Sequence, residues 1–198
     1  MALVRQLTKA GIRVQIGHTN GNYDVGVAAL EHGAAGFTHL FNAMPGLHHR
    51  DPGMVGAALA HAEYAEIIPD LLHVHPGAIR TALRCIPKLF CVTDSTAAAG
   101  MPDGEYMLGR QTVHKCMGGV RLADGTLAGS TLTMDQALRN LVQIGLPLEE
   151  ASRRVSTNAA DYLGETARGR LAPGCHADFV VLDRSLAIKA VYIEGEPL

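Results

Sequence analysis

Four side chains that can bind a metal or move a proton stand at, or just beyond, the ends of four predicted strands. They are His18, His39, His73 and Asp94. Imidazole nitrogens are common ligands of divalent metals, and a nearby carboxylate can act as the base for a water that such a metal activates. Each residue alone has a simpler interpretation, since a strand-end histidine is more often structural and a strand-end aspartate often caps a helix. Their occurrence at four successive strand ends favours a catalytic site.

The strands that carry these residues alternate with helices along the first half of the chain. Strand, helix and strand at this spacing predict an α/β protein with a parallel sheet. Because the carboxyl ends of parallel strands lie on one face, the four side chains can meet in one pocket. The predicted strands cover residues 13–19, 36–40, 65–70 and 88–93, and the predicted helices cover residues 23–33 and 76–85.

Gly, Pro and cap residues indicate the other segments. Residues 42–59 predict a long irregular connection, which is a candidate functional loop. Short β-like pieces between Met107 and Gly129 predict a hairpin, and the tail predicts two strands of a separate small sheet. Cap residues predict two more helices, one from Ser130 or Thr131 through Leu141 and one over residues 148–163 that ends at Gly164.

The composition excludes several classes of function. The 198 residues include 17 Lys and Arg against 19 Asp and Glu, a formal net charge of −2, which offers no footprint for nucleic acid or an anionic membrane. No window reaches the roughly 18 apolar residues of a membrane span, and the first residues contain no signal-peptide pattern, so we expect a cytoplasmic protein. The four cysteines form no CxxC pair and are expected to be reduced thiols.

Several motifs at these strand ends resemble a known family. The segments GHTN (17–20), THLFNAM (38–44), DLLH (70–73), VTDST (92–96) and GTLAGSTLTM (125–134) closely resemble the C-terminal half of the N-acetylglucosamine-6-phosphate deacetylases. These are metal-dependent members of the amidohydrolase superfamily, and the tail GRLAPGCHADFVVLD (169–183) is similar to the tail of that superfamily as a whole. The resemblance covers essentially the whole chain.

The resemblance implies roles for individual residues. His18 and His39 match metal ligands, with zinc as the expected divalent metal, and Asp94 matches the catalytic acid/base. Arg50 matches an arginine that reaches the phosphate of a neighbouring subunit's substrate; from the residues alone it is more simply a solvated charge. The residues that the resemblance assigns to substrate binding are Asn42 and Ala43 at the sugar phosphate, Arg50, Asp70, His73 near the acetamido group, and Leu127, Ala128 and Gly129 in a lining loop. Leu71 stands where the family usually has a glycine.

The resemblance also implies a fold and its division. Residues 1–168 match the last four strands and helices of a (β/α)8 TIM-type metal-dependent hydrolase barrel, and residues 169–198 match the C-terminal strands of a small β-sandwich domain. The metal-binding glutamate of the family precedes the GH motif by a long stretch and has no counterpart here, because only 17 residues precede His18 in this sequence. Catalytic zinc usually has three protein ligands. We therefore expect the chain to be incomplete as a catalyst by itself, and to work as a homodimer or with a missing N-terminal half.

The implied reaction is hydrolysis of the acetamide of N-acetylglucosamine 6-phosphate to glucosamine 6-phosphate and acetate, a step of amino-sugar metabolism. A metal-activated water would attack the acetyl carbonyl, with Asp94 as acid/base. Two alternatives stay open. One is a different amidohydrolase that acts on a cyclic amide or nucleobase, which would leave Asn42, Ala43 and Arg50 with no phosphate to bind. The other is a catalytically inactive half-barrel.

Overall fold

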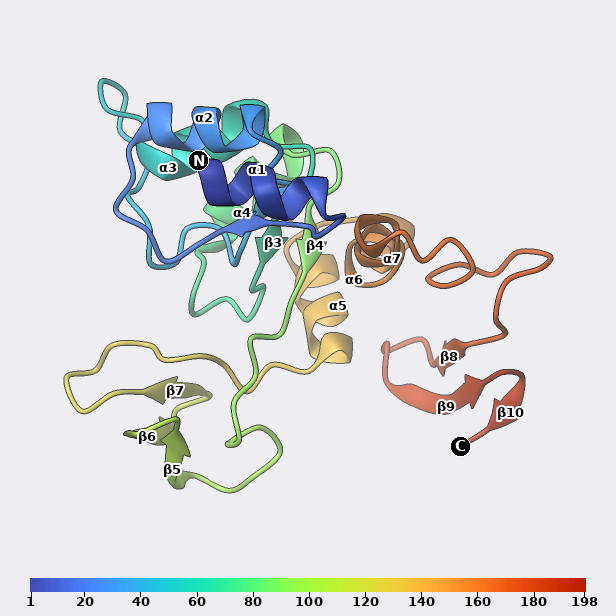
Figure 1. Cartoon of the computed structure of the whole chain (residues 1–198). Coiled ribbons are helices and arrows are strands. Elements are labelled where there is room, and N and C mark those ends of the chain that lie inside the picture. Colours follow the sequence, from blue (N-terminus) through green and yellow to red (C-terminus); the bar gives the residue numbers. More distant parts are fainter.

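A computed structural model describes residues 1–198, and its centre is a row of short parallel strands (Figure 1). β1 pairs with β2 and β3 pairs with β4, both in parallel, and a parallel bridge between Phe37 and Ala65 joins the two pairs. One helix connects each strand to the next, which confirms the predicted alternation except between β2 and β3, where no helix was predicted. The strands are β1 (Gln15–Ile16), β2 (Gly36–Phe37), β3 (Glu66–Ile67) and β4 (Phe90–Cys91), and the connecting helices are α2 (Tyr23–Glu31), α3 (Gly53–His61) and α4 (Pro76–Cys85).

Both helices predicted in this part of the chain, α2 and α4, begin at residues that suit a helix start. The Asn22 side chain accepts a hydrogen bond from the Val25 backbone N–H at the start of α2, and Pro76 is the first residue of α4. The first helix, α1 (Ala2–Lys9), packs beside the end of α2, where the Thr8 hydroxyl donates to the Gly33 carbonyl.

The hydrophobic core lies between these strands and helices. Phe37, Ile67, Ile79 and Leu89 are all completely buried in one cluster. Cys91 belongs to the same cluster, and burial raises the pKa of its thiol to about 12, so it behaves as a small apolar residue. All four cysteines are free, as expected.

The predicted irregular connection over residues 42–59 is wrong in its second half, because α3 begins at Gly53. This helix has no polar face, since its residues from Gly53 to Ala58 are all buried, so the amphipathic period that identifies a surface helix is missing. Its small residues allow close packing on α2. A Cβ at Gly26 of α2 would lie only 2.6 Å from the Cβ of Ala57.

The helices after residue 130 also differ from the prediction. α5 (Met134–Gln143) begins later than expected, because the Ser130 hydroxyl donates to the Thr93 carbonyl instead of capping a helix. The single helix predicted over residues 148–163 is two helices, α6 (Leu148–Val155) and α7 (Thr157–Leu163). The break is at Ser156, whose φ of −141° is not helical. The expected end at Gly164 is confirmed by its φ of +80°.

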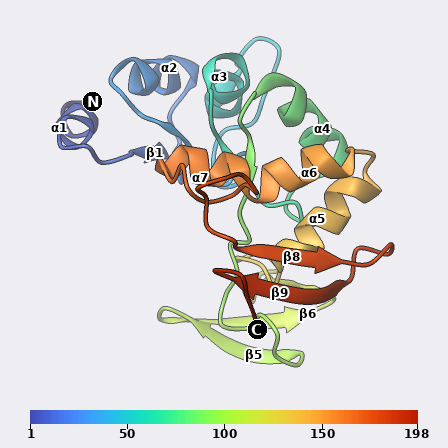
Figure 2. The ribbon, with the colours of Figure 1, turned by 90° about the vertical axis from the view of Figure 1, so that its right-hand side faces the viewer.

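Two antiparallel sheets project from the helical body (Figures 1 and 2). The predicted hairpin is a three-stranded sheet, and the tail forms another three-stranded sheet that shares no strand with the rest. None of the helices is both long and apolar enough to span a bilayer. The first sheet contains β5 (Gly104–Leu108), β6 (Gln111–Cys116) and β7 (Gly119–Arg121), and the second contains β8 (Phe179–Leu182), β9 (Ile188–Ile193) and β10 (Glu196–Pro197).

A buried arginine on α6 fixes the entry into β4. Arg154 is 7% exposed, and its Nη1 donates to the carbonyls of Pro87 at 2.8 Å and Leu89 at 3.1 Å, while Nη2 pairs with Glu150 at 2.5 Å. The Leu89 carbonyl also accepts the Asn158 amide of α7 at 3.0 Å, so side chains from both α6 and α7 tie these helices to the strand that leads to Asp94.

We expect Arg154→Met to lower the free energy of unfolding by about 1–3 kcal/mol, because it removes the hydrogen bonds that a buried charged guanidinium donates to the Pro87 and Leu89 carbonyls. Arg153→Met is the matched control, because Arg153 also pairs with a glutamate four residues earlier but is 60% exposed. Its effect should stay within about 0.5 kcal/mol. Urea unfolding measures both, and equal losses would show that the carbonyl contacts do not stabilise the fold.

Candidate functional site

The register of β1 against β2 brings His18 and His39 together. Ile16 is paired with Phe37, and each histidine lies two residues beyond its member of that pair. Gly17 permits the close approach, since a Cβ there would lie 2.8 Å from the Cβ of Thr38. The two Nε2 atoms are 2.9 Å apart, and the rings meet edge to face with centroids separated by 4.7 Å. The structure therefore places this predicted pair in direct contact.

The backbone is strained at the predicted site. Left-handed φ angles are uncommon outside glycine, and they cluster at functional sites. Nine non-glycine residues have positive φ, and four of them are predicted site residues. These four are His18 (44°), His39 (29°), Ala43 (51°) and Asp94 (49°). The chain thus turns sharply after β1, β2 and β4, where each side chain leaves its strand.

The histidine pair fits a divalent metal as two of its ligands. The two Nε2 atoms are 2.9 Å apart, close enough for both to reach one metal ion, and the buried Nδ1 of His39 has no hydrogen-bond partner. No group of three His, Cys, Asp or Glu in the chain is arranged to hold a metal. Since a catalytic zinc usually has three protein ligands, the pair forms part of a metal centre and needs at least one further donor.

Glu66, a residue that the sequence analysis missed, supports His39 from the next strand. Its Oε2 accepts the backbone N–H of His39 at 3.3 Å, and its Oε1 accepts the Gln15 amide at 2.8 Å. Gln15 in turn accepts the Thr38 hydroxyl at 3.0 Å, so a polar chain crosses β1, β2 and β3 below the histidines. The sequence contains one signal for this role, because Glu66 is a charged residue next to the apolar residues Ile67 and Ile68 in a predicted strand.

Asp70 and His73 form a second pair, beyond β3. The His73 Nδ1 lies 2.6 Å from Asp70 Oδ2, and Asp70 Oδ1 accepts the backbone N–H groups of Leu72 at 2.9 Å and His73 at 2.8 Å. Burial raises the pKa of the Asp70 carboxyl, but the hydrogen bonds from the His73 ring and from the two backbone N–H groups outweigh it and hold that pKa below its usual value. Asp70 is therefore ionised at neutral pH.

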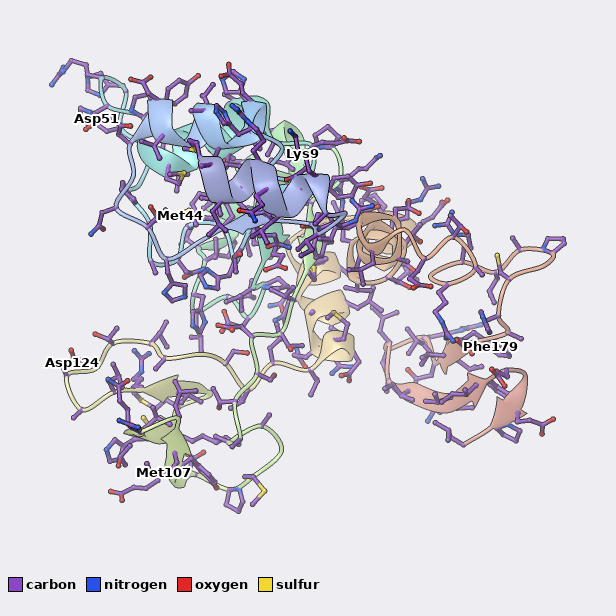
Figure 3. All side chains as sticks on the ribbon, in the orientation of Figure 1. Lys9, Met44, Asp51, Met107, Asp124 and Phe179 are labelled. Atoms are coloured by element: carbon purple, nitrogen blue, oxygen red, sulfur yellow. The ribbon has the colours of Figure 1, made fainter.

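The loop after β2 contains the residues predicted to bind phosphate. The Asn42 amide donates to the carbonyls of His39 and Leu40, and the Ala43 carbonyl accepts the Thr19 N–H, so Asn42 and Ala43 lie beside the two histidines. Arg50 does not join them. It is exposed, with Nη1 2.7 Å from His49 Nε2, on a loop whose tip Figure 3 shows at Asp51, far from Met44.

The predicted lining loop at residues 127–129 runs beside Asp94. The Ser130 N–H donates to the Asp94 carbonyl at 2.7 Å, and the Thr96 N–H donates to the Ser130 carbonyl at 3.0 Å. Gly129, with φ of +76°, fits closely here, because a Cβ would lie 2.5 Å from the Thr96 methyl. The Asp94 side chain is exposed and makes no hydrogen bond, so it remains available for proton transfer.

Comparison with known proteins gives a consistent result. A family model described as the amidohydrolase family matches residues 1–198. The chain is 44% identical to N-acetylglucosamine-6-phosphate deacetylase from Lysinibacillus sphaericus, over 95% of this chain and 50% of the relative. It is 43% identical to a putative N-acetylgalactosamine-6-phosphate deacetylase from Escherichia coli K12, over 80% of this chain and 97% of the relative.

Solved structures are similar as well. The crystal structure of N-acetylglucosamine-6-phosphate deacetylase from Pasteurella multocida superimposes with a TM-score of 0.94 at 34% identity, over 98% of this chain and 52% of that chain. The chain thus spans about half the length of the first curated relative and of this structure.

Gly129→Ala should destabilise the protein more than Gly125→Ala. Both glycines have positive φ, so both substitutions introduce left-handed strain of about 1–2 kcal/mol. Only at position 129 does the new methyl also meet the segment that holds Asp94, since nothing lies within 4 Å of a Cβ at Gly125. Unfolding in urea measures the difference, and equal effects would show that the loop can move away from Asp94 without cost.

Proposed function

The chain belongs to the amidohydrolase family, and from this we propose that it forms part of the active site of an N-acetylglucosamine-6-phosphate deacetylase. The observation that carries the proposal is the His18–His39 pair, with facing Nε2 atoms at the ends of adjacent parallel strands. Such a pair is suited to hold a metal for amide hydrolysis.

The fold proposal is the second half of a (β/α)8 barrel. Four parallel strands separated by helices support the assignment of residues 1–168 to the last four strands and helices of the barrel. The separate antiparallel sheet of β8, β9 and β10 supports the assignment of residues 169–198 to a small β-domain. The coverage of about half of each full-length relative agrees with this division.

The chemistry divides between a metal and Asp94. A divalent metal held by His18 and His39, with zinc as the natural candidate, supplies Lewis-acid chemistry when bound. Asp94 takes a proton from the water that attacks the acetyl carbonyl, and it passes that proton to the amine nitrogen as the C–N bond breaks. The products are acetate and glucosamine 6-phosphate. The exposed Asp94 carboxylate, which has no competing hydrogen bond, supports this role.

The substrate contacts follow from the loops around the pair. Asn42 and Ala43 lie beside the histidines and are proposed to bind the sugar phosphate, with Leu127, Ala128 and Gly129 lining the sugar. Arg50 lies on an exposed loop away from the pair, which supports a contact with the phosphate bound by a neighbouring subunit and hence a homodimer. A guanidinium suits this task because it binds phosphate with two parallel hydrogen bonds.

The 4-epimer of the sugar is a second candidate substrate. The Escherichia coli relative named for N-acetylgalactosamine 6-phosphate is 43% identical, almost as similar as the relative from Lysinibacillus sphaericus at 44%. Both substrates place an acetamide and a 6-phosphate on a hexose, so the residues proposed above serve either one. The two sugars differ only in the direction of one hydroxyl.

Asp94→Asn should abolish deacetylation and leave the metal bound. The test joins this chain to the half of a full-length relative that it does not span, and follows acetate release from N-acetylglucosamine 6-phosphate, its 4-epimer and unphosphorylated N-acetylglucosamine. The unmutated protein should prefer the phosphorylated sugars. Turnover that survives Asp94→Asn would remove Asp94 from its role, and a preference for the unphosphorylated sugar would contradict the phosphate contacts.

Zinc uptake by the joined protein should depend on the histidine pair. We expect equilibrium dialysis followed by elemental analysis to find zinc on the unmutated joined protein and on its Asp94→Asn variant, and its loss in His39→Gln. His114→Gln on the hairpin strand β6 is the control and should retain zinc. An unmutated joined protein without zinc would contradict the assignment of His18 and His39 as metal ligands and favour the catalytically inactive half-barrel.

A further inference from the structure

We propose that Asp70 is a positioning residue for His73: it fixes the proton of the ring on Nδ1 and leaves Nε2 as the atom that contacts the ligand. The inference deepens the proposed function and rests on it for one point, the identity of the ligand as an amino-sugar phosphate. The tautomer itself follows from the contacts of these two residues.

Both carboxylate oxygens of Asp70 have hydrogen-bond partners within the chain. Oδ1 accepts two backbone N–H groups, from Leu72 and His73, and Oδ2 faces the His73 Nδ1 at 2.6 Å. The side chains are only 10% exposed for Asp70 and 6% for His73. Leu71, with a φ of +65°, makes the tight turn that brings the ring of His73 back onto the carboxylate. Asp70 therefore contributes to ligand binding through His73.

An ionised carboxylate can only accept hydrogen bonds, so the ring nitrogen that faces it must carry a proton. The same hydrogen bonds hold the pKa of Asp70 below its usual value, which keeps the carboxylate ionised. The tautomer of a histidine is set by the hydrogen bond that its other nitrogen makes. In the neutral ring, Nε2 is then a bare acceptor.

The free acceptor predicts what His73 recognises. Nε2 has no hydrogen-bond partner within the chain. It is not one of the fully buried polar atoms that lack a partner, so it is not completely enclosed by the protein. When the neutral ring carries its proton on Nδ1, Nε2 can only accept a hydrogen bond, so its partner must be a donor on the ligand. On an amino-sugar phosphate that donor is a ring hydroxyl or the amide N–H. A carbonyl or phosphate oxygen would instead need a proton on Nε2.

Asp70→Asn should invert the tautomer. The two backbone N–H groups of Leu72 and His73 hold an oxygen at the Oδ1 position, so the amide nitrogen of the asparagine takes the place of Oδ2. That NH2 group donates to His73 Nδ1, which must then be unprotonated, and the proton moves to Nε2. The substitution preserves size and the backbone hydrogen bonds, so the turn should persist.

The experiment is ¹H–¹⁵N multiple-bond NMR of the histidine rings in the ¹⁵N-labelled chain, at a pH where the rings are neutral. His73→Gln identifies the signals of His73 by their loss. The unmutated ring should show Nδ1 protonated, and Asp70→Asn should show mainly Nε2 protonated. Asp124→Asn is the matched control, because Asp124 also accepts a backbone N–H in a turn, at 2.9 Å from Thr126, and should leave the His73 signals unchanged.

Two results would overturn the inference. One is a mainly Nε2-protonated His73 in the unmutated chain, a measurement that needs no variant to fold. The other is an Asp70→Asn ring that keeps its Nδ1 proton. The NMR readout does not depend on turnover, so a deacetylase assay that fails contradicts the proposed function while the tautomer assignment stands or falls by the spectra.

Discussion

The register of β1 against β2 is the constraint on which the candidate metal site depends. Ile16 opposite Phe37 places His18 and His39 at equal distances beyond the pairing, and a shift of one residue would send one ring to the opposite face. Parallel strands cannot set such a register with a short turn. Helix α2 sets it instead, because its length and its packing on α3 through Gly26 and Ala57 fix where β2 begins.

The sharp turns after the strands need support from their surroundings. Left-handed φ angles at His18, His39 and Asp94 cost about 1–3 kcal/mol each. At His39 the support is the Glu66 carboxylate, which accepts its backbone N–H. At Asp94 it is the Ser130 N–H, which donates to the Asp94 carbonyl. These contacts join segments that are far apart in the sequence, so the packed domain determines the direction of each functional side chain.

The sequence predicts the parts of this arrangement that depend on local patterns. Gly33 at a helix end, Pro76 at a helix start and the apolar runs correctly indicate α2, α4 and the order of the parallel strands. Helix α3 is not predicted because it is apolar on all sides, and the predicted helix over residues 148–163 runs through Ser156, although serine is a common N-cap residue.

The same limit applies to the candidate site. His18 and His39 can be predicted to meet because topology alone brings adjacent strand ends together. Glu66 cannot be predicted, because its partner His39 lies on a neighbouring strand. The exposed position of Arg50 depends in the same way on the path of a whole loop.

The site residues divide into groups that are satisfied within the chain and groups that are not. The Asp70 carboxylate is satisfied by the His73 ring and two backbone N–H groups, and the loop beside Asp94 is closed by hydrogen bonds of its own. His39, in contrast, is 7% exposed and has an Nδ1 with no partner, an arrangement that costs about 1–3 kcal/mol in an apolar interior. Metal-ligating histidines almost always donate that second N–H to an acceptor outside the metal's own ligand set. His39 therefore needs two partners that this chain does not supply, an acceptor for Nδ1 and a third ligand for the metal.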